Sequence, residues 1–110
     1  MENFDRPTPN SARARRAYPA TPQKLLTAVE KAIEELPRWS LQHSDDEELS
    51  AVRQTRLFRF KDDVTVHIEQ TGESSEALFE SASRVGKGDL GQNPRNLQEL
   101  LEAVDRHLGQ

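Results

Sequence analysis

Two amphipathic helical patterns, one toward each end of the chain, most constrain how this sequence can fold. The apolar positions of the first recur at the spacing of one helix face, at Leu25, Val29, Ala32, Ile33 and Leu36. Those of the second are Leu97, Leu100, Leu101, Val104 and Leu108. Such a stripe is buried only when another element covers it. The residues between the two helices therefore have to supply a surface that covers both.

Residues with strong positional preferences mark the ends of these helices. Thr21 is a favoured N-cap and Pro22 suits the first helical turn. Asn93 and Pro94 repeat this arrangement at the second helix, and Gly109 is a typical C-terminal stop. The sequence thus predicts two helices whose ends are marked by specific residues.

Four extended segments lie between the helices, at 39–43, 49–60, 64–69 and 77–85. The third alternates apolar and polar residues, which indicates a strand with one buried face. Short connections favour antiparallel pairing. We predict an α+β fold with a four-stranded antiparallel sheet and two helices packed on one face, in the order helix, four strands, helix.

The fourth segment also permits a prediction of which side chains the helices cover. We expect Ala77, Phe79, Ser81, Ser83 and Val85 under the helices, because side chains alternate between the two faces of a strand. Glu80 and Arg84 then point to the other face.

The first 20 residues differ in composition from the rest of the chain. They contain three of the six prolines, show no apolar period and carry a net charge of +2, against −6 for the remainder. We expect residues 1–20 to form a disordered or extended arm, of which residues 1–18 are dispensable for folding, and residues 21–110 to form a single small α+β domain. The acidic domain argues against a nucleic-acid partner, because nucleic-acid binding relies on clustered Lys and Arg.

Several classes of protein are excluded or disfavoured by what the sequence lacks. There is no cysteine, so disulfides, thiol nucleophiles and iron–sulfur clusters are ruled out. The three histidines, His43, His67 and His107, fall in different elements without metal-ligand spacing. No apolar run approaches the about 20 residues of a membrane helix. We expect a cytoplasmic protein with no membrane span, no metal and no cofactor.

A glycine-rich loop before the second helix is the segment that most resembles a binding site. Arg84, Lys87 and Arg95 supply positive charge there, and the helix N-terminus that follows favours anions. The alternative is a structural turn in which Asp89 and Asn93 bond the loop amides. These residues alone leave both interpretations open.

Two stretches, TRLFRFKDDV at 55–64 and SASRVGKGDLGQNPR at 81–95, resemble the family called domain of unknown function 1499. The resemblance spans about residues 20–108. The positions that match its motifs are Arg56, Asp62, Asp63, Ser83, Arg84, Gly86, Asp89, Gly91 and Asn93. The family implies no activity, so the resemblance places these residues in its motifs without assigning a role to any of them.

The sequence therefore predicts a small, non-enzymatic domain of unknown role that binds a small anionic ligand or a protein partner. The candidate ligand-binding residues are Arg56, Asp62, Asp63, Ser83, Arg84, Lys87, Asp89, Asn93 and Arg95, and no residue is assigned as catalytic. One alternative is an enzyme that uses Asp62 or Asp63 as a base with Arg84 as an electrostatic stabiliser. Another is a pure protein-interaction module.

Overall fold

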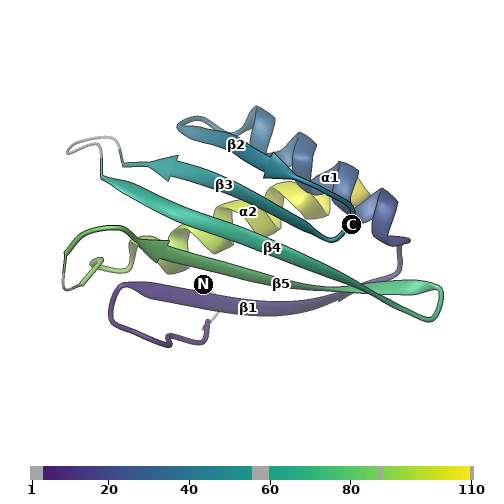
Figure 1. Cartoon of the computed structure of the whole chain (residues 1–110), viewed down its shortest axis with the longest axis horizontal. Coiled ribbons are helices and arrows are strands. Elements are labelled where there is room, and N and C mark those ends of the chain that lie inside the picture. The colour runs from purple at the N-terminus through teal and green to yellow at the C-terminus, as the bar shows by residue number, and fades with distance from the viewer. Residues whose placement is uncertain (1–3, 56–59, 87, 110) are drawn as a thin grey trace.

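The computed structural model of the chain describes residues 4–55, 60–86 and 88–109. Both predicted helices form, and they pack together on one face of an antiparallel sheet (Figure 1). The elements in chain order are β1 (Ser11–Tyr18), α1 (Pro22–Glu35), β2 (Trp39–Ser44), β3 (Glu48–Gln54), β4 (Lys61–Thr71), β5 (Ser74–Ser83) and α2 (Gln92–Leu108).

The sheet has five strands, in the order β1-β5-β4-β3-β2, so the prediction of four is wrong by one. The additional strand is β1, which lies at one edge and pairs with β5 from Ser11 opposite Ala82 to Tyr18 opposite Ser75. In its sequence, SARARRAY, the buried residues Ala12 and Ala14 alternate with the exposed residues Arg13 and Arg15. Alanine carries too little apolar surface to stand out as a strand pattern, which is why sequence analysis assigned this segment to an arm.

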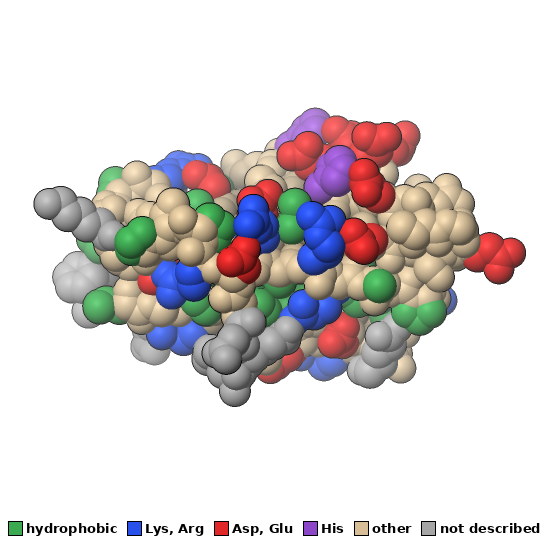
Figure 2. Space-filling model, turned by 90° about the horizontal axis from the view of Figure 1, so that it is seen from below, with side chains coloured by type: hydrophobic (Ala, Val, Ile, Leu, Met, Phe, Trp, Pro, Cys, Tyr) green, Lys and Arg blue, Asp and Glu red, His purple; other side chains and the backbone are tan. Residues whose placement is uncertain are grey.

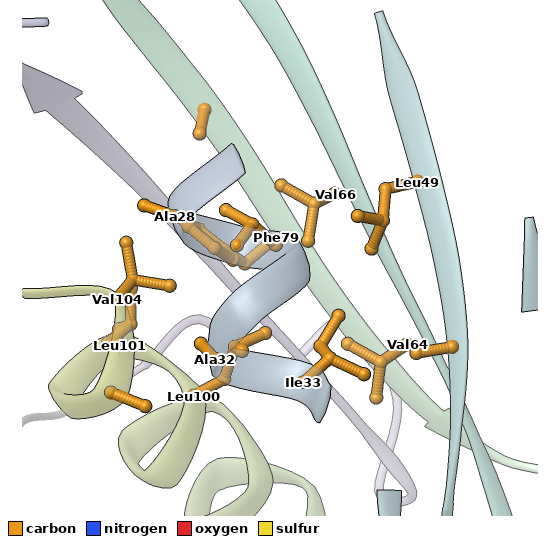
Figure 3. Close-up of a cluster of buried hydrophobic side chains, with 14 of the residues drawn as sticks. Ala28, Ala32, Ile33, Leu49, Val64, Val66, Phe79, Leu100, Leu101 and Val104 are labelled. Carbon is orange, nitrogen blue, oxygen red and sulfur yellow. The ribbon is translucent and has the colours of Figure 1, made fainter. Parts of the chain in front are cut away.

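The core lies between the helices and the sheet (Figure 3). In β5, Ala77, Phe79 and Ser81 are buried beneath the helices, which confirms the predicted register of that strand. Val85 lies beyond the end of β5 and is 56% exposed, so the helices do not cover it as expected. The largest fully buried side chains are Phe79, Leu25, Ile33, Leu49, Leu97 and Leu100.

The two helices begin in different ways. Thr21 caps α1 as predicted, because its hydroxyl accepts a hydrogen bond from the backbone N–H of Lys24 at 3.2 Å. The N-cap position of α2 is Gly91, in a left-handed conformation with φ 80°, and Asn93 lies inside the first turn. A different side chain therefore has to satisfy the first amides of α2.

Candidate functional site

The two family motifs meet at one end of the sheet. The start of β4 and the loop that joins β5 to α2 lie at the same end of the sheet, at the left in Figure 1. The backbone N–H of Arg84 donates to the carbonyl of Lys61 at 3.1 Å, which extends the β4–β5 pairing past the last residue of β5. Side chains far apart in sequence are thereby brought within reach of each other.

The carboxylate of Asp89 caps α2. Its Oδ1 accepts from the backbone N–H of Gly91 at 2.8 Å, and its Oδ2 accepts from the backbone N–H of Asn93 at 3.1 Å. The side-chain amide of Asn93 donates to Oδ2 at 2.8 Å, and Arg6 donates to Oδ1 at 2.8 Å. The chain's own carboxylate thus takes the place that an anion occupies at an open helix N-terminus.

The environment of Asp89 favours its charged form. Its side chain is only 2% exposed, and burial by itself raises the pKa of a carboxyl. The hydrogen bonds from Asn93, Gly91 and Arg6 outweigh that effect, so the pKa of Asp89 lies below its usual value. Arg6 comes from the segment assigned to the N-terminal arm, and sequence analysis gave no signal for this contact.

A buried network of polar side chains joins the first turns of α2 to the sheet. Ser81 donates through Oγ to Oδ1 of Asn93 at 2.6 Å. The side-chain amide of Asn96 donates to Oδ2 of Asp62 at 2.8 Å and to Oγ of Ser81 at 3.1 Å. All four side chains belong to residues that are at most 2% exposed. Buried polar groups that satisfy one another in this way fix a single packing arrangement.

Asn93 also connects this network to the end of β5 and to the N-terminal segment. Its side-chain amide lies 2.9 Å from Oγ of Ser83 and 2.8 Å from the backbone carbonyl of Asn10. Asn10 in turn donates from its side chain to the carbonyl of Gly86 at 2.8 Å. Asn93 is fully buried, so its role in the structure is to hold α2, β5 and the N-terminal segment together.

Arg84 and Asp63 form a separate, exposed ion pair. Nε and Nη2 of Arg84 lie 3.0 Å and 2.8 Å from the two carboxylate oxygens of Asp63. No hydrogen bond or ion pair joins Arg84 to Asp62 or Asp89, all of which the structure describes. Asp62 faces the helices and Arg84 faces the opposite side, so these two residues do not form a joint acid/base site.

Of the other cations predicted to bind a ligand, the structure describes Arg95. Arg95 donates from Nη1 to the carbonyl of Leu90 at 3.1 Å and from Nη2 to Oε1 of Gln92 at 3.3 Å. Arg56 and Lys87 lie outside the residues that the structure describes.

A hollow of about 680 Å³ lies at this end of the molecule. Its polar lining includes four of the residues chosen from the sequence: Asp62, Ser83, Asp89 and Arg95. Its apolar lining is Phe60, Val85 and Leu90, which are 51%, 56% and 95% exposed. These three are the exposed large hydrophobic residues of the described chain. We call this site the apolar-rimmed hollow.

Leu90 is exposed and also has an unfavourable backbone. Its φ is 52°, a left-handed conformation that a leucine seldom adopts. The prediction from the sequence concerns the backbone amides and the charge of this loop and does not include its apolar side chains. The only available signal was a leucine set among glycine and polar residues, which no helix or strand pattern explained.

The space-filling view shows how charge is distributed around this end. In Figure 2, Lys and Arg side chains are interspersed with Asp and Glu side chains across the visible face. Hydrophobic side chains reach the surface at several places in this view, including the left end, where β4 begins in Figure 1. The described residues contain no group of three or more His, Asp or Glu side chains that could hold a metal ion. No helix among them is both long and apolar enough for a membrane span.

The model for the protein family of unknown function DUF1499 matches residues 3–104. The chain belongs to this family. The match includes β1, so the N-terminal strand lies within the DUF1499 region. A search of curated proteins gives no significant match.

Solved structures from bacteria share the fold of this DUF1499 domain. A protein from Arthrobacter aurescens has a TM-score of 0.72 at 10% identity, covering 97% of this chain and 91% of its own. A protein from Mesorhizobium loti has a TM-score of 0.66 at 12% identity, covering 90% of this chain and 96% of its own. A Rhizobium loti protein has a TM-score of 0.64 at 12% identity, covering 88% and 95%. At these identities the likeness concerns the fold alone.

Proposed function

We propose that this DUF1499 domain is a non-enzymatic binding protein that holds a small molecule with an apolar part in the apolar-rimmed hollow. The observation that carries the proposal is that all exposed large hydrophobic residues of the described chain line this one hollow. A bound apolar group that covers these side chains gains roughly 25 cal/mol of stabilisation per Å² of apolar surface removed from water. The volume of about 680 Å³ is within the range typical of small-molecule pockets.

The polar lining restricts the chemistry of the ligand's other end. Asp62 and Asp89 place two carboxylates in the lining, against the one guanidinium of Arg95. Arg95 is bonded to Leu90 and Gln92, and the carboxylate of Asp89 already accepts four hydrogen bonds, so the excess of negative charge in the lining decides the preference. The lining therefore favours a head group that donates hydrogen bonds, such as an amine or a hydroxyl, over a carboxylate.

Leu90 supports this proposal through its conformation. A leucine at positive φ costs on the order of 1–3 kcal/mol and here gains no burial in return. Contact with the apolar part of a ligand explains why an apolar side chain occupies this exposed position.

A head-group series tests the proposal directly. Hexylamine, hexanol and hexanoate each have a six-carbon skeleton and differ in their head group and its charge, and amide chemical shifts of the full chain report binding. We expect hexylamine and hexanol to shift the resonances of Val85, Gly88 and Leu90 in a saturable way, with hexanoate weaker. Tighter binding of hexanoate would instead favour the anionic ligand predicted from the sequence.

Leu90→Asn separates binding from folding. Asparagine tolerates left-handed φ better than leucine, and Leu90 is 95% exposed, so the variant should fold at least as stably as the parent. Its affinity for the alkyl probes should nevertheless fall. Leu78→Asn, a partly exposed leucine in β5 outside the hollow lining, is the matched control. The proposal is wrong if Leu90→Asn binds the probes as well as the parent does.

A further inference from the structure

A second hollow, of about 420 Å³, lies on the side of the sheet opposite the helices. Three of its lining residues are cations: Arg38, Lys61 and Arg84. Hydrogen-bonding side chains from Ser40, Gln42 and Gln54 line the space around them. None of the described lining residues is acidic, although the chain as a whole carries a net charge of −4. We call this site the basic hollow.

Backbone pairing places the cations in one row across the sheet. Gln54 at the end of β3 pairs with Lys61 at the start of β4. The N–H of Gln54 donates to the carbonyl of Arg38 at 2.9 Å, and the N–H of Arg84 donates to the carbonyl of Lys61 at 3.1 Å. Positions opposite one another on neighbouring strands project to the same face, at a spacing of about 4.8 Å. Arg38, Lys61 and Arg84 therefore project to one side.

Strand alternation separates the basic hollow from the apolar-rimmed hollow. Lys61 and Arg84 line the basic hollow, whereas their neighbours Asp62, Ser83 and Val85 line the apolar-rimmed hollow. The two sites therefore lie on opposite faces of the same end of the sheet, and a ligand in one does not require a ligand in the other.

The arrangement of the three cations is unfavourable for the protein alone. Lys61 and Arg84 are like charges at opposed positions on adjacent segments, which destabilises a sheet. Asp63 binds Nε and Nη2 of Arg84. Among the described residues, none forms an ion pair with Arg38 or Lys61, and none accepts a hydrogen bond from Nη1 of Arg84. Positive charge at this site thus exceeds what the surrounding side chains neutralise.

Arg38 provides a second, independent observation. It has a φ of 68°, a left-handed conformation that is uncommon for a residue other than glycine, asparagine or aspartate. The strained turn directly precedes β2 and presents a charged side chain to the basic hollow. Strain that persists at a residue lining a charged concavity is typical of a ligand-binding position.

We propose that the basic hollow binds a small polyanion that carries two or more anionic groups, of the phosphate or carboxylate type. Lys61, at the centre of the row, contacts the ligand between Arg38 and Arg84. Asp63 holds the guanidinium of Arg84 in place, while Gln54 and Ser40 complete the hydrogen bonding. Ligands with a single negative charge bind more weakly, because they engage only part of the row.

The test uses two probes of different chemistry, inorganic pyrophosphate and citrate, titrated into the full chain with amide chemical shifts as readout. We expect saturable shifts at Ser40, Gln54 and Lys61 with at least one of the probes. Lys61→Gln should lower the affinity at least ten-fold, which corresponds to about 1.4 kcal/mol, because it removes a charge-assisted hydrogen bond. Preference for one probe identifies which of the two chemistries the site takes.

A second variant and a matched control guard against indirect effects. Arg38→Asn removes the charge and suits positive φ, so it should fold normally and also bind about ten-fold more weakly. Lys31→Gln removes an exposed charge from α1, on the other face, and should leave the affinity nearly unchanged. Leu90→Asn should likewise retain pyrophosphate and citrate binding, which separates this proposal from that for the apolar-rimmed hollow.

Three results would overturn the proposal. These are the absence of saturable binding of both probes, an equal loss of affinity in Lys31→Gln and Lys61→Gln, and shifts that map away from the basic hollow.

Discussion

Replacing Asp89 with asparagine should expose how far α2 depends on its capping carboxylate. Asparagine keeps one oxygen for Gly91 and Arg6 but turns an NH₂ group toward the backbone N–H and side-chain amide of Asn93. The side-chain amide has other acceptors in Ser83 and Asn10, so the stranded group is the buried backbone N–H of Asn93. Such a donor costs about 1–3 kcal/mol, and losing the negative charge at the helix N-terminus costs about 0.3–1 kcal/mol more. We expect a loss of about 3 kcal/mol in the free energy of unfolding.

Urea denaturation followed by far-UV circular dichroism at pH 7 measures this loss. The difference between parent and variant should also depend on pH. Because the folded-state pKa of Asp89 is below its usual value, its charge stabilises the fold above the unfolded-state pKa of about 3.9. That contribution disappears as the pH falls through the folded-state pKa, so the two proteins should converge in stability at acidic pH.

Asp63→Asn is the matched control for Asp89→Asn. It removes a carboxylate of the same family motifs, but one whose side chain is 51% exposed and whose ion pair with Arg84 is open to solvent. Exposed pairs contribute little to stability, so this variant should unfold close to the parent. A loss below about 1 kcal/mol for Asp89→Asn, or equal losses for the two variants, would refute the assignment of Asp89 as the buried cap.

Three further outcomes follow from burial. Deleting residues 1–18 removes β1, and the buried ring of Tyr18 alone is worth about 3–5 kcal/mol, so thermal unfolding should shift by far more than the few degrees expected for a dispensable arm. Burial, followed by the nearby charge of Asp105, raises the pKa of Tyr18, the single tyrosine. Absorbance at 295 nm should show no phenolate near pH 10, and stability should decline as the pH rises above the unfolded-state pKa of about 10. Trp39 is 8% exposed and donates to Glu99 through Nε1, so Trp39→Ala should cost about 3–5 kcal/mol, and the native fluorescence should be blue-shifted from that of free tryptophan.

The helices and the central strands were predictable because their buried side chains recur at the regular spacing of a helix or of a strand. The stripe at Leu25, Val29 and Ile33 is buried as its spacing requires, and the β5 register places Phe79 beneath the helices. The strand β1 was not predictable from the same rules. Its buried positions include Ala12 and Ala14, and its placement depends on pairing with β5, which is distant in sequence.

The candidate site stays a prediction, but the structure shows which contacts of the nominated residues the sequence could not indicate. The residues nominated from the motifs include Asp62 and Asp89, which both line the apolar-rimmed hollow, and Arg84 after β5 pairs with Lys61 at the start of β4. The motifs could not indicate that Asp89 is bonded to Arg6, because that contact joins residues 83 positions apart. Nor could they separate Asp62 from Asp63, whose side chains point to opposite faces and serve different neighbours.

The structure gives a physical reason why matching a family motif does not by itself identify a binding residue. Asn93 is fully buried and Asp89 caps a helix, so we expect both residues to stabilise this end of the molecule, whatever it binds. The side chains left available to a ligand are those that the fold does not use: Leu90 in the apolar-rimmed hollow and Lys61 in the basic hollow. Variants at Asn93 or Asp89 should therefore lose stability and binding together. Variants at Leu90 and Lys61 should each lose one kind of binding while the fold persists, which makes them the informative positions for function.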